Sequence, residues 1–148
     1  MVRLLVWNGF LFRDCTNSDI NGVLKLAQKN LITKYVNYKL LTNNNCFICI
    51  HSKQVIGFVV YNKEQLKCIC VDEKFRNKRI GNFLISYCSK DNHLACYIPN
   101  CINKNIQKSL QRNKFKCTGQ ILAPCKIDST KINCQCNQTN CSYFIYKK

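Results

Sequence analysis

Apolar residues recur at helical spacing near the beginning of the chain. Thr16 and Asp19 are spaced as in a capping box, with Asp in the place of the usual Glu or Gln. Five apolar residues then fall at positions i, i+3, i+4, i+7 and i+11, namely Ile20, Val23, Leu24, Ala27 and Leu31. This stripe predicts an amphipathic helix over about residues 18–30. We expect a short strand over 10–13 before it and a weaker helix within 32–42 after it.

Strand-like and helical patterns alternate through the middle of the chain. Three apolar runs, separated by turn-rich segments, cover residues 46–51, 55–61 and 66–71. They predict an antiparallel meander. A helical pattern then runs from Ile80 to about Lys90, and residues 94–98 form a buried-strand pattern that ends at Pro99. A strand, a helix and a strand in this order predict a right-handed crossover to a parallel neighbour.

The last part of the chain continues the alternation. The patterns predict a helix over 103–113, a strand from Phe115 to about residue 122, a polar loop over 124–140 and a last strand over 142–146. The sequence contains no internal repeat and no linker-like stretch. A length of 148 residues is typical of one compact unit, so we expect a single domain over residues 1–148.

Composition places the chain among globular proteins of a reducing compartment. Apolar residues make up 47% of the chain, and no apolar run is long enough to cross a membrane or to serve as a signal peptide. The 13 cysteines are scattered, and many lie inside apolar runs, where a thiol behaves as a small hydrophobe. We therefore expect an intracellular protein, cytoplasmic or nuclear, with free thiols and no membrane partner.

A zinc site is the alternative use for the late cysteines. Four of them, Cys125, Cys134, Cys136 and Cys141, could in principle hold a tetrahedral metal ion. Their spacing lacks the paired Cys-x-x-Cys knuckles of common structural zinc sites. The prediction is therefore that no metal is bound.

The charge balance points to anionic ligands. The chain has 23 Lys and Arg residues against seven Asp and Glu residues, a formal net charge of +16. A field of this sign attracts phosphates, which leaves nucleic acid open as a partner, although a bias in composition explains a solvated basic surface equally well. The densest basic cluster comprises Lys74, Arg76, Lys78 and Arg79.

This cluster lies between a predicted strand and a predicted helix, over residues 71–82. The N-terminus of a helix presents unpaired N–H groups and a partial positive charge, which together hold a diphosphate. The segment is therefore a candidate phosphate site, and the alternative is a solvated basic turn before an ordinary helix.

The same segment resembles the acetyl-CoA signature of the GNAT N-acetyltransferase family, which is Gln or Arg, two residues, Gly, any residue, then Gly or Ala. The frame here runs from Arg76 to Gly81, with the lead-in Val71-Asp-Glu-Lys-Phe-Arg76. Arg79 stands at the place of the first glycine. Further stretches resemble the family in order along the chain: residues 13–19, residues 54–61, and Asn103 with Phe115 at the end. Leu110 and Lys114 stand where the family usually has a tyrosine and a glycine.

The resemblance implies an α/β (α+β) fold with a GNAT-like mixed, mostly antiparallel central sheet of about six to seven strands flanked by about four helices. It also implies that acetyl-CoA binds in a gap between two splayed strands. The positions that the resemblance assigns to the cofactor are Ile69, Cys70, Val71, Arg76, Asn77, Lys78, Arg79, Ile80, Gly81, Asn82 and Asn103.

The implied reaction is direct transfer of the acetyl group to an amine, which must first lose a proton. Glu64 is the candidate base, with Gln65 fitting its position about as well, and Tyr97 is a second candidate. A water relay is equally plausible. The family's tyrosine commonly protonates the departing thiolate, which Leu110 cannot do. Cys68 and Cys70 are more simply explained as packed residues than as acyl-accepting nucleophiles.

Two other functions stay open beside an amine acetyltransferase that favours acidic acceptors. One is a GNAT fold of weak or absent activity that binds RNA or DNA through its basic surface. The other is a protein that binds acetyl-CoA only as a sensor or structural ligand. The sequence indicates neither the acceptor amine nor the oligomeric state.

Overall fold

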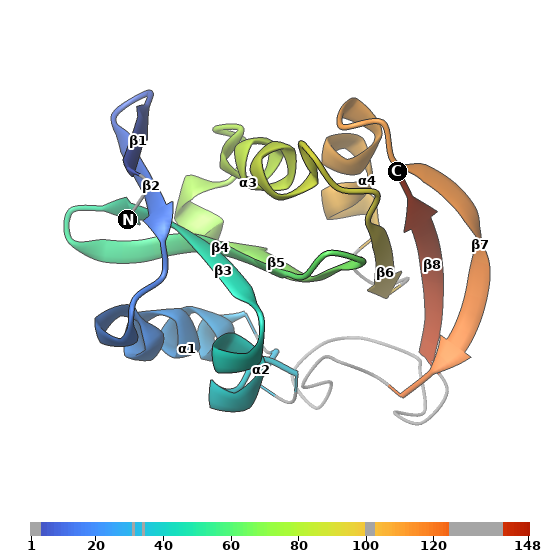
Figure 1. Ribbon diagram of the computed structural model, residues 1–148, viewed down its shortest axis with the longest axis horizontal. Helices are drawn as coiled ribbons and strands as arrows, with labels where there is room; N and C mark the ends of the chain where they lie inside the picture. Colours follow the sequence, from blue (N-terminus) through green and yellow to red (C-terminus); the bar gives the residue numbers. More distant parts are fainter. Residues whose placement is uncertain (1–3, 31, 34, 100–102, 125–140) are drawn as a thin grey trace.

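The computed structural model describes residues 4–30, 32–33, 35–99, 103–124 and 141–148. Within these ranges one eight-stranded sheet has the order β1-β2-β3-β4-β5-β6-β8-β7 (Figure 1). The strands are β1 (Leu4–Trp7), β2 (Phe10–Asp14), β3 (Asn45–His51), β4 (Gln54–Tyr61), β5 (Gln65–Val71), β6 (Ala95–Pro99), β7 (Lys116–Ala123) and β8 (Cys141–Lys147). The helices are α1 (Ile20–Lys29), α2 (Tyr38–Asn43), α3 (Ile80–Ser89) and α4 (Asn103–Arg112), with 3-10 turns η1 (Asn17–Asp19) and η2 (Glu73–Phe75).

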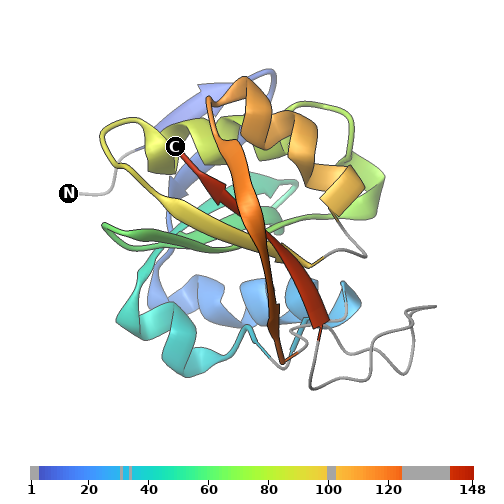
Figure 2. The ribbon, with the colours of Figure 1, turned by 90° about the vertical axis from the view of Figure 1, so that its right-hand side faces the viewer.

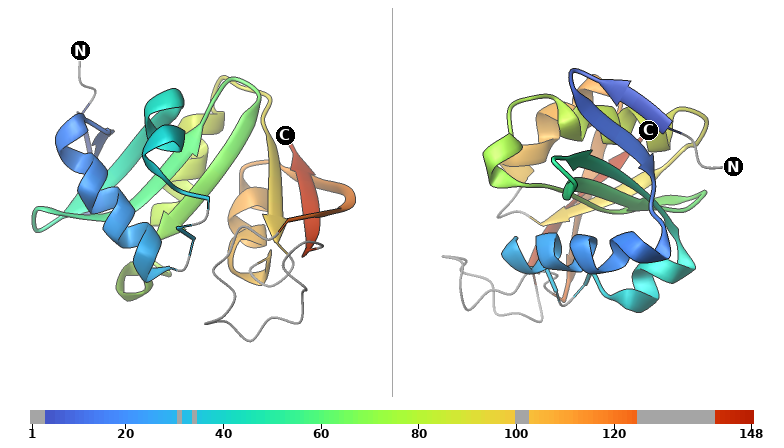
Figure 3. Two further views of the ribbon diagram at one scale, coloured as in Figure 1. Left: turned by 90° about the horizontal axis from the view of Figure 1, so that it is seen from below. Right: turned by 90° about the vertical axis from the view of Figure 1, so that its left-hand side faces the viewer.

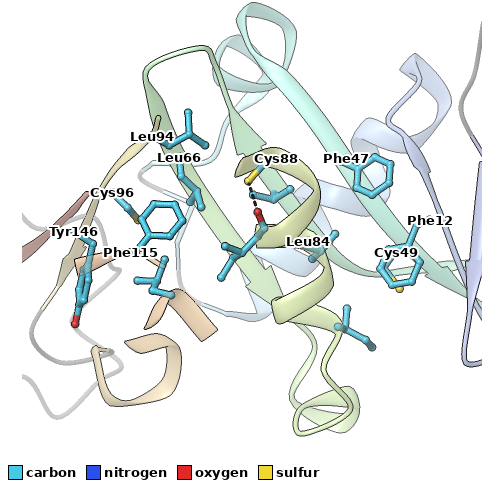
Figure 4. Close-up of a cluster of buried hydrophobic side chains, with 14 of the residues drawn as sticks. Phe12, Phe47, Cys49, Leu66, Leu84, Cys88, Leu94, Cys96, Phe115 and Tyr146 are labelled. Carbon is cyan, nitrogen blue, oxygen red and sulfur yellow. Dashed lines mark hydrogen bonds between the residues drawn. The ribbon is translucent and has the colours of Figure 1, made fainter. Parts of the chain in front are cut away.

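Helices cover both faces of the sheet. α1 and α2 lie on one face, called here the α1 face, and α3 and α4 lie on the other, the α3 face (Figures 1 and 2). Each face has its own apolar cluster. On the α3 face, Leu84 of α3 packs between Phe47 on one side and Leu66 on the other (Figure 4). On the α1 face, Val23 and Ala27 of α1 are buried against strand residues such as Phe58.

The predicted meander is confirmed, and so is the parallel neighbour predicted across the helix. β3, β4 and β5 pair antiparallel in sequence order, and β5 pairs parallel with β6 across α3. The mixed, mostly antiparallel sheet and its four flanking helices therefore match the predicted fold class. The sheet has one more strand than the six to seven predicted, because β1 was not identified. None of the described helices has the length and apolarity needed to cross a membrane.

The capping box before α1 is confirmed, with a 3-10 turn inserted between the cap and the helix. The carboxylate of Asp19 accepts hydrogen bonds from the main chain and side chain of Thr16, at 2.8 Å each. Arg13 of β2 donates two hydrogen bonds to the same carboxylate, which lowers the pKa of Asp19 to about 2. The start of α1 is thereby fixed to the sheet.

The second predicted helix is shorter than expected. A helix was predicted within 32–42, whereas α2 begins only at Tyr38, after Asn37 caps it by accepting from the N–H of Leu40 (2.9 Å). An Asn side chain that bonds the main chain in this way favours a helix start over a helix interior. The predicted polar loop over 124–140 lies outside the described residues from 125 onward.

Candidate functional site

The strands β5 and β6 pair only at one end. Their register joins Gln65 to Ala95 and Leu66 to Cys96, and the N–H of Ala95 donates to the carbonyl of Glu64 (2.9 Å). Beyond these positions the described parts of the two strands are not paired, and they diverge (Figure 3, left). An unpaired stretch inside a sheet exposes main-chain donors and acceptors, which a ligand can satisfy.

The alternation of an antiparallel ladder decides which residues of β5 face this opening. The N–H of Asp72 donates to the carbonyl of Ile56 (2.7 Å), so the main chain of Asp72, and that of Cys70 two residues earlier, points to β4. The main-chain groups of Ile69 and Val71 therefore point the other way, toward the opening. Of the three positions predicted on this strand, Cys70 does not present its main chain to the gap.

The basic segment after β5 leads directly into α3, as predicted. The first hydrogen bond of the helix runs from the N–H of Phe83 to the carbonyl of Arg79 (3.0 Å). The N–H groups of Ile80, Gly81 and Asn82 come before it, so they have no acceptor within the helix. The side chains of Lys78 and Arg79 are exposed beside them. Main-chain donors, the helix dipole and two cations thus gather at one point, which suits an anion such as a diphosphate.

The turn into α3 explains why glycine is common at the position of Arg79. Arg79, which caps α3, has φ 63 and ψ 18, and Asn77 has φ 64. Both are in the left-handed region, which costs a residue with a side chain about 1–2 kcal/mol, less for Asn. This chain keeps the turn with Arg at a position that favours glycine.

Arg76 is exposed, and its guanidinium is hydrogen-bonded within the protein. Its guanidinium donates to the carbonyl of Val71 (3.3 Å, from Nε) and to the side-chain oxygen of Asn30 (2.8 Å). Next to it, Lys29 and Asp72 form an ion pair at 3.0 Å. Lys29, which pairs with Asp72, and Asn30, which accepts from Arg76, were not predicted for the site. A contact between residues more than 40 positions apart leaves no local pattern in the sequence.

A glycine in β4 lets α3 approach the sheet closely. A Cβ atom at Gly57 would lie 3.3 Å from the side chain of Ile80 and 3.4 Å from the carbonyl oxygen of Cys70. Since real Cβ atoms seldom have such close neighbours, the position of the α3 N-terminus depends on the missing side chain.

Leu110 lies in the last turn of α4 and is part of the core. The N–H of Phe115 donates to the carbonyl of Leu110 (3.0 Å), the N–H of Lys114 donates to that of Gln111 (3.0 Å), and Lys114 has φ 67. This is the Schellman arrangement, in which the left-handed residue is usually glycine. The side chains of Leu110 and Phe115 are both buried in the cluster of the α3 face.

The two candidate proton-transfer residues lie at different places relative to the opening. Glu64 is exposed in the turn before β5, at the end where β5 and β6 are still hydrogen-bonded. Tyr97 directly follows Cys96, the last residue of β6 that pairs with β5, and is half-buried. Its neighbours Cys96 and Ile98 point to the α3 face, so Tyr97 points to the α1 face.

The remaining predicted positions are partly described. Asn103 begins α4. Among the described residues no group of three His, Cys, Asp or Glu side chains is placed to hold a metal ion. Cys125, Cys134 and Cys136 lie outside the described residues.

Comparisons with known proteins agree on the fold. No family model matches the chain, and no curated protein sequence matches it significantly. Among solved structures, Arabidopsis thaliana NAA60 in complex with acetyl-CoA is 14% identical, with 94% of this chain and 97% of that chain covered and a TM-score of 0.66.

Two bacterial structures have the same fold over most of their length. An acetyltransferase of the GNAT family from Streptococcus pneumoniae is 13% identical over 94% of this chain and 98% of that chain, with a TM-score of 0.66. The ribosomal-protein-S5-alanine acetyltransferase of Vibrio fischeri is 12% identical over 99% of this chain and 96% of that chain, with a TM-score of 0.70. Together with the divergent β5 and β6 and the basic turn before α3, these likenesses show that the chain has the fold of the GNAT N-acetyltransferases.

Proposed function

We propose that this protein is an acetyl-CoA-dependent N-acetyltransferase, which transfers the acetyl group to an amine of a protein or small molecule by direct attack. The observation that carries the proposal is the opening between β5 and β6 next to the N-terminus of α3. The similar structures support it, since one of them was solved with acetyl-CoA and the others are acetyltransferases.

The proposed cofactor lies along the opening. Its pyrophosphate accepts hydrogen bonds from main-chain amides of the segment from Arg76 to Asn82, and Lys78 and Arg79 supply countercharge. Its pantetheine arm extends along β5, where the main chain of Ile69 and the N–H of Val71 take the place of strand pairing, while the carbonyl of Val71 accepts from Arg76. The thioester is thereby held near the point where β5 and β6 separate, and Asn103 lies at the start of α4, a further predicted cofactor position.

Tyr97 and Glu64 are the two candidates for moving the proton of the acceptor amine. An alkyl amine with a pKa near 10.4 must lose a proton before it attacks. Tyr97 stands next to the separation of the strands, whereas Glu64 lies beyond the paired end, so we favour Tyr97 over Glu64 for moving a proton. Leu110 is buried in the core and has no acidic group that could donate a proton to the thiolate.

The test is acetyl transfer from acetyl-CoA to a panel of protein N-termini, lysine peptides, polyamines and small amines, with the product detected by mass. Mass detection avoids thiol reagents, which would react with the protein's own cysteines. We expect turnover with at least one amine. We also expect Tyr97→Phe to lower kcat by roughly 10²-fold at unchanged KM. The matched variant Glu64→Gln should leave kcat unchanged, and the reverse pattern would assign the role to Glu64.

A second candidate function is binding without turnover, either of acetyl-CoA alone or together with nucleic acid. Besides Leu110, a basic hollow beside β7 and β8 favours it. The hollow has a volume of about 780 Å³ and is lined by His93, Gln111, Lys114, Phe115, Lys116, Lys147 and Lys148. Lys116 and Lys147 are direct neighbours across β7 and β8, a like-charge pair that an anion would relieve.

The two functions are separated by one comparison. Calorimetric binding of acetyl-CoA with no product from any amine would favour the second candidate. Binding of a short single-stranded RNA that weakens with salt, and weakens further in a Lys116→Glu and Lys147→Glu double variant, would assign the hollow to nucleic acid.

A further inference from the structure

Cys15 and Cys46 lie opposite each other where β2 meets β3. The register pairs Asp14 with Phe47, so the next pair along the ladder is Cys15 with Cys46. The N–H of Cys15 donates to the carbonyl of Cys46 (2.9 Å). In a hydrogen-bonded antiparallel pair the Cα atoms are about 5.5 Å apart, inside the usual range of disulfides, about 4.4–6.8 Å.

The two thiols lie in one apolar environment. Cys46 is buried in the cluster of the α1 face, Cys15 packs against this cluster, and the thiol of Cys15 donates to the carbonyl of Thr16 (3.5 Å). The neighbouring Cys46 lowers the pKa of Cys15, and the neighbouring Cys15, together with burial, raises the pKa of Cys46. Cys15 is partly exposed whereas Cys46 is 9% exposed. One thiol is thus accessible and more easily ionised, and its partner is held beside it.

Several other thiols lack this combination. Burial raises the pKa of Cys49 and of Cys88 to about 12, which keeps both protonated and shielded. Cys117 is exposed, but its partner across the ladder is Tyr146 and not a second cysteine. Reactivity of a cysteine requires both access and thiolate character.

We propose that Cys15 and Cys46 form a reversible disulfide when a peroxide oxidises the protein. The Cys15 thiolate attacks one oxygen of hydrogen peroxide, the O–O bond breaks, and the hydroxide that leaves takes up a proton to become water. The sulfur of Cys46 then attacks the resulting Cys15 sulfenic acid, the S–O bond breaks, and the Cys46 proton leaves with the hydroxyl as a second water. Two thiols and one peroxide thus give one disulfide and two waters.

The position of the pair gives the disulfide a structural consequence. The loop that it closes contains both α1 and α2, so the oxidised chain loses conformational freedom in the unfolded state. Cys15 also directly precedes the capping box of α1. At its other end α1 leads into Asn30, which holds Arg76 of the candidate site. We expect the oxidised protein to unfold at a higher temperature than the reduced protein.

The test is peptide mapping of the whole protein after mild treatment with hydrogen peroxide, without reduction before digestion. Trypsin releases Cys15 within residues 14–25, and it releases Cys46 together with Cys49 within residues 40–53. We expect these two peptides linked, with the loss of two hydrogens, and separated again by dithiothreitol. Cys49→Ala should keep the link, and Cys15→Ser should abolish it.

Two products of the peroxide treatment would contradict the proposal. Sulfinic acid at Cys15 with Cys46 still reduced would overturn it, as would a dominant link from Cys15 to any other cysteine. Because the peptide mapping uses the unsubstituted protein, it tests the proposal even if a variant does not fold. Iodoacetamide labelling of the reduced protein adds an independent measurement, in which Cys15 should react roughly tenfold or more faster than Cys49.

Discussion

At two helix ends a basic residue occupies a backbone position that favours glycine, Arg79 before α3 and Lys114 after α4. In the sequence both were visible only as departures from a family pattern. The structure supplies the physical reason for that pattern, since each residue has a positive φ at a helix end. The charge of Arg79 is also unfavourable at a helix N-terminus unless an anion lies there.

Replacing Arg79 by glycine should stabilise the protein in the absence of ligand. Relief of the left-handed backbone gains about 1–2 kcal/mol, and the more flexible unfolded chain costs about 0.4–1 kcal/mol, so a net gain of about 0.5–1 kcal/mol is expected. Urea denaturation measures it. Lys78→Gly is the matched control, because Lys78 is outside the left-handed region and should lose stability. Equal destabilisation by both changes would contradict this explanation.

Residue roles were the least predictable feature of the site. The amides around Gly81 follow from the position of the segment between a strand and a helix, and a local pattern is enough to locate them. The hydrogen bonds of Arg76 and the direction of the main chain of Ile69, toward the opening, depend on a contact with Asn30 and on the ladder with β4. Such contacts are set by tertiary packing, which the local sequence does not report.

Elements with strong periodicity were predicted well, and short ones poorly. The stripe of α1 agrees with the structure because one face of this helix is buried, and the continuous apolar runs of β3 and β4 agree because helices cover both faces of the sheet. The strand β1 was missed, although Asn8-Gly9, with φ values of 51 and 81, is a typical hairpin turn that could have indicated it. The opening between β5 and β6 is a relation between elements, so only the family resemblance indicated it.

The close contact between α3 and β4 can be tested by a substitution of Gly57. Gly57→Ala should place a Cβ against Ile80 and the carbonyl of Cys70, destabilise the protein by about 1–3 kcal/mol, and weaken acetyl-CoA binding by displacing the start of α3. Thermal unfolding and calorimetry measure the two effects. The control is Gly119→Ala, another strand glycine, where a Cβ meets nothing within 4 Å. If the two variants behaved alike, the close approach of α3 would not position the site.

The whole molecule carries a formal charge of +16 with only seven carboxylates. A field of this strength attracts anions from a distance, in addition to any specific contact. The described carboxylates are partly engaged already, Asp19 with Arg13 and Asp72 with Lys29. We therefore expect an acceptor that carries negative charge near its amine to be preferred over a polyamine.

Salt should weaken this preference. Acidic amine peptides should show a higher kcat/KM than matched basic peptides at low ionic strength. The difference should fade toward 1 M salt, where the Debye length falls to about 3 Å. A series of kcat/KM values across salt concentrations measures it. A basic peptide preferred at low salt would mean that a local acidic groove outweighs the overall field.

The most direct test of the site is the affinity of acetyl-CoA measured by calorimetry for two substitutions of Gly81. Proline removes the N–H of Gly81, which precedes the helical ladder, whereas alanine keeps it and meets only Val71 at 3.7 Å. We predict that Gly81→Ala binds acetyl-CoA as the natural protein does. Gly81→Pro, with its fold verified by circular dichroism, should lose about 1.5–3 kcal/mol, or roughly ten- to hundredfold in affinity. Equal affinity of the two folded variants would contradict the placement of the pyrophosphate on the α3 N-terminus.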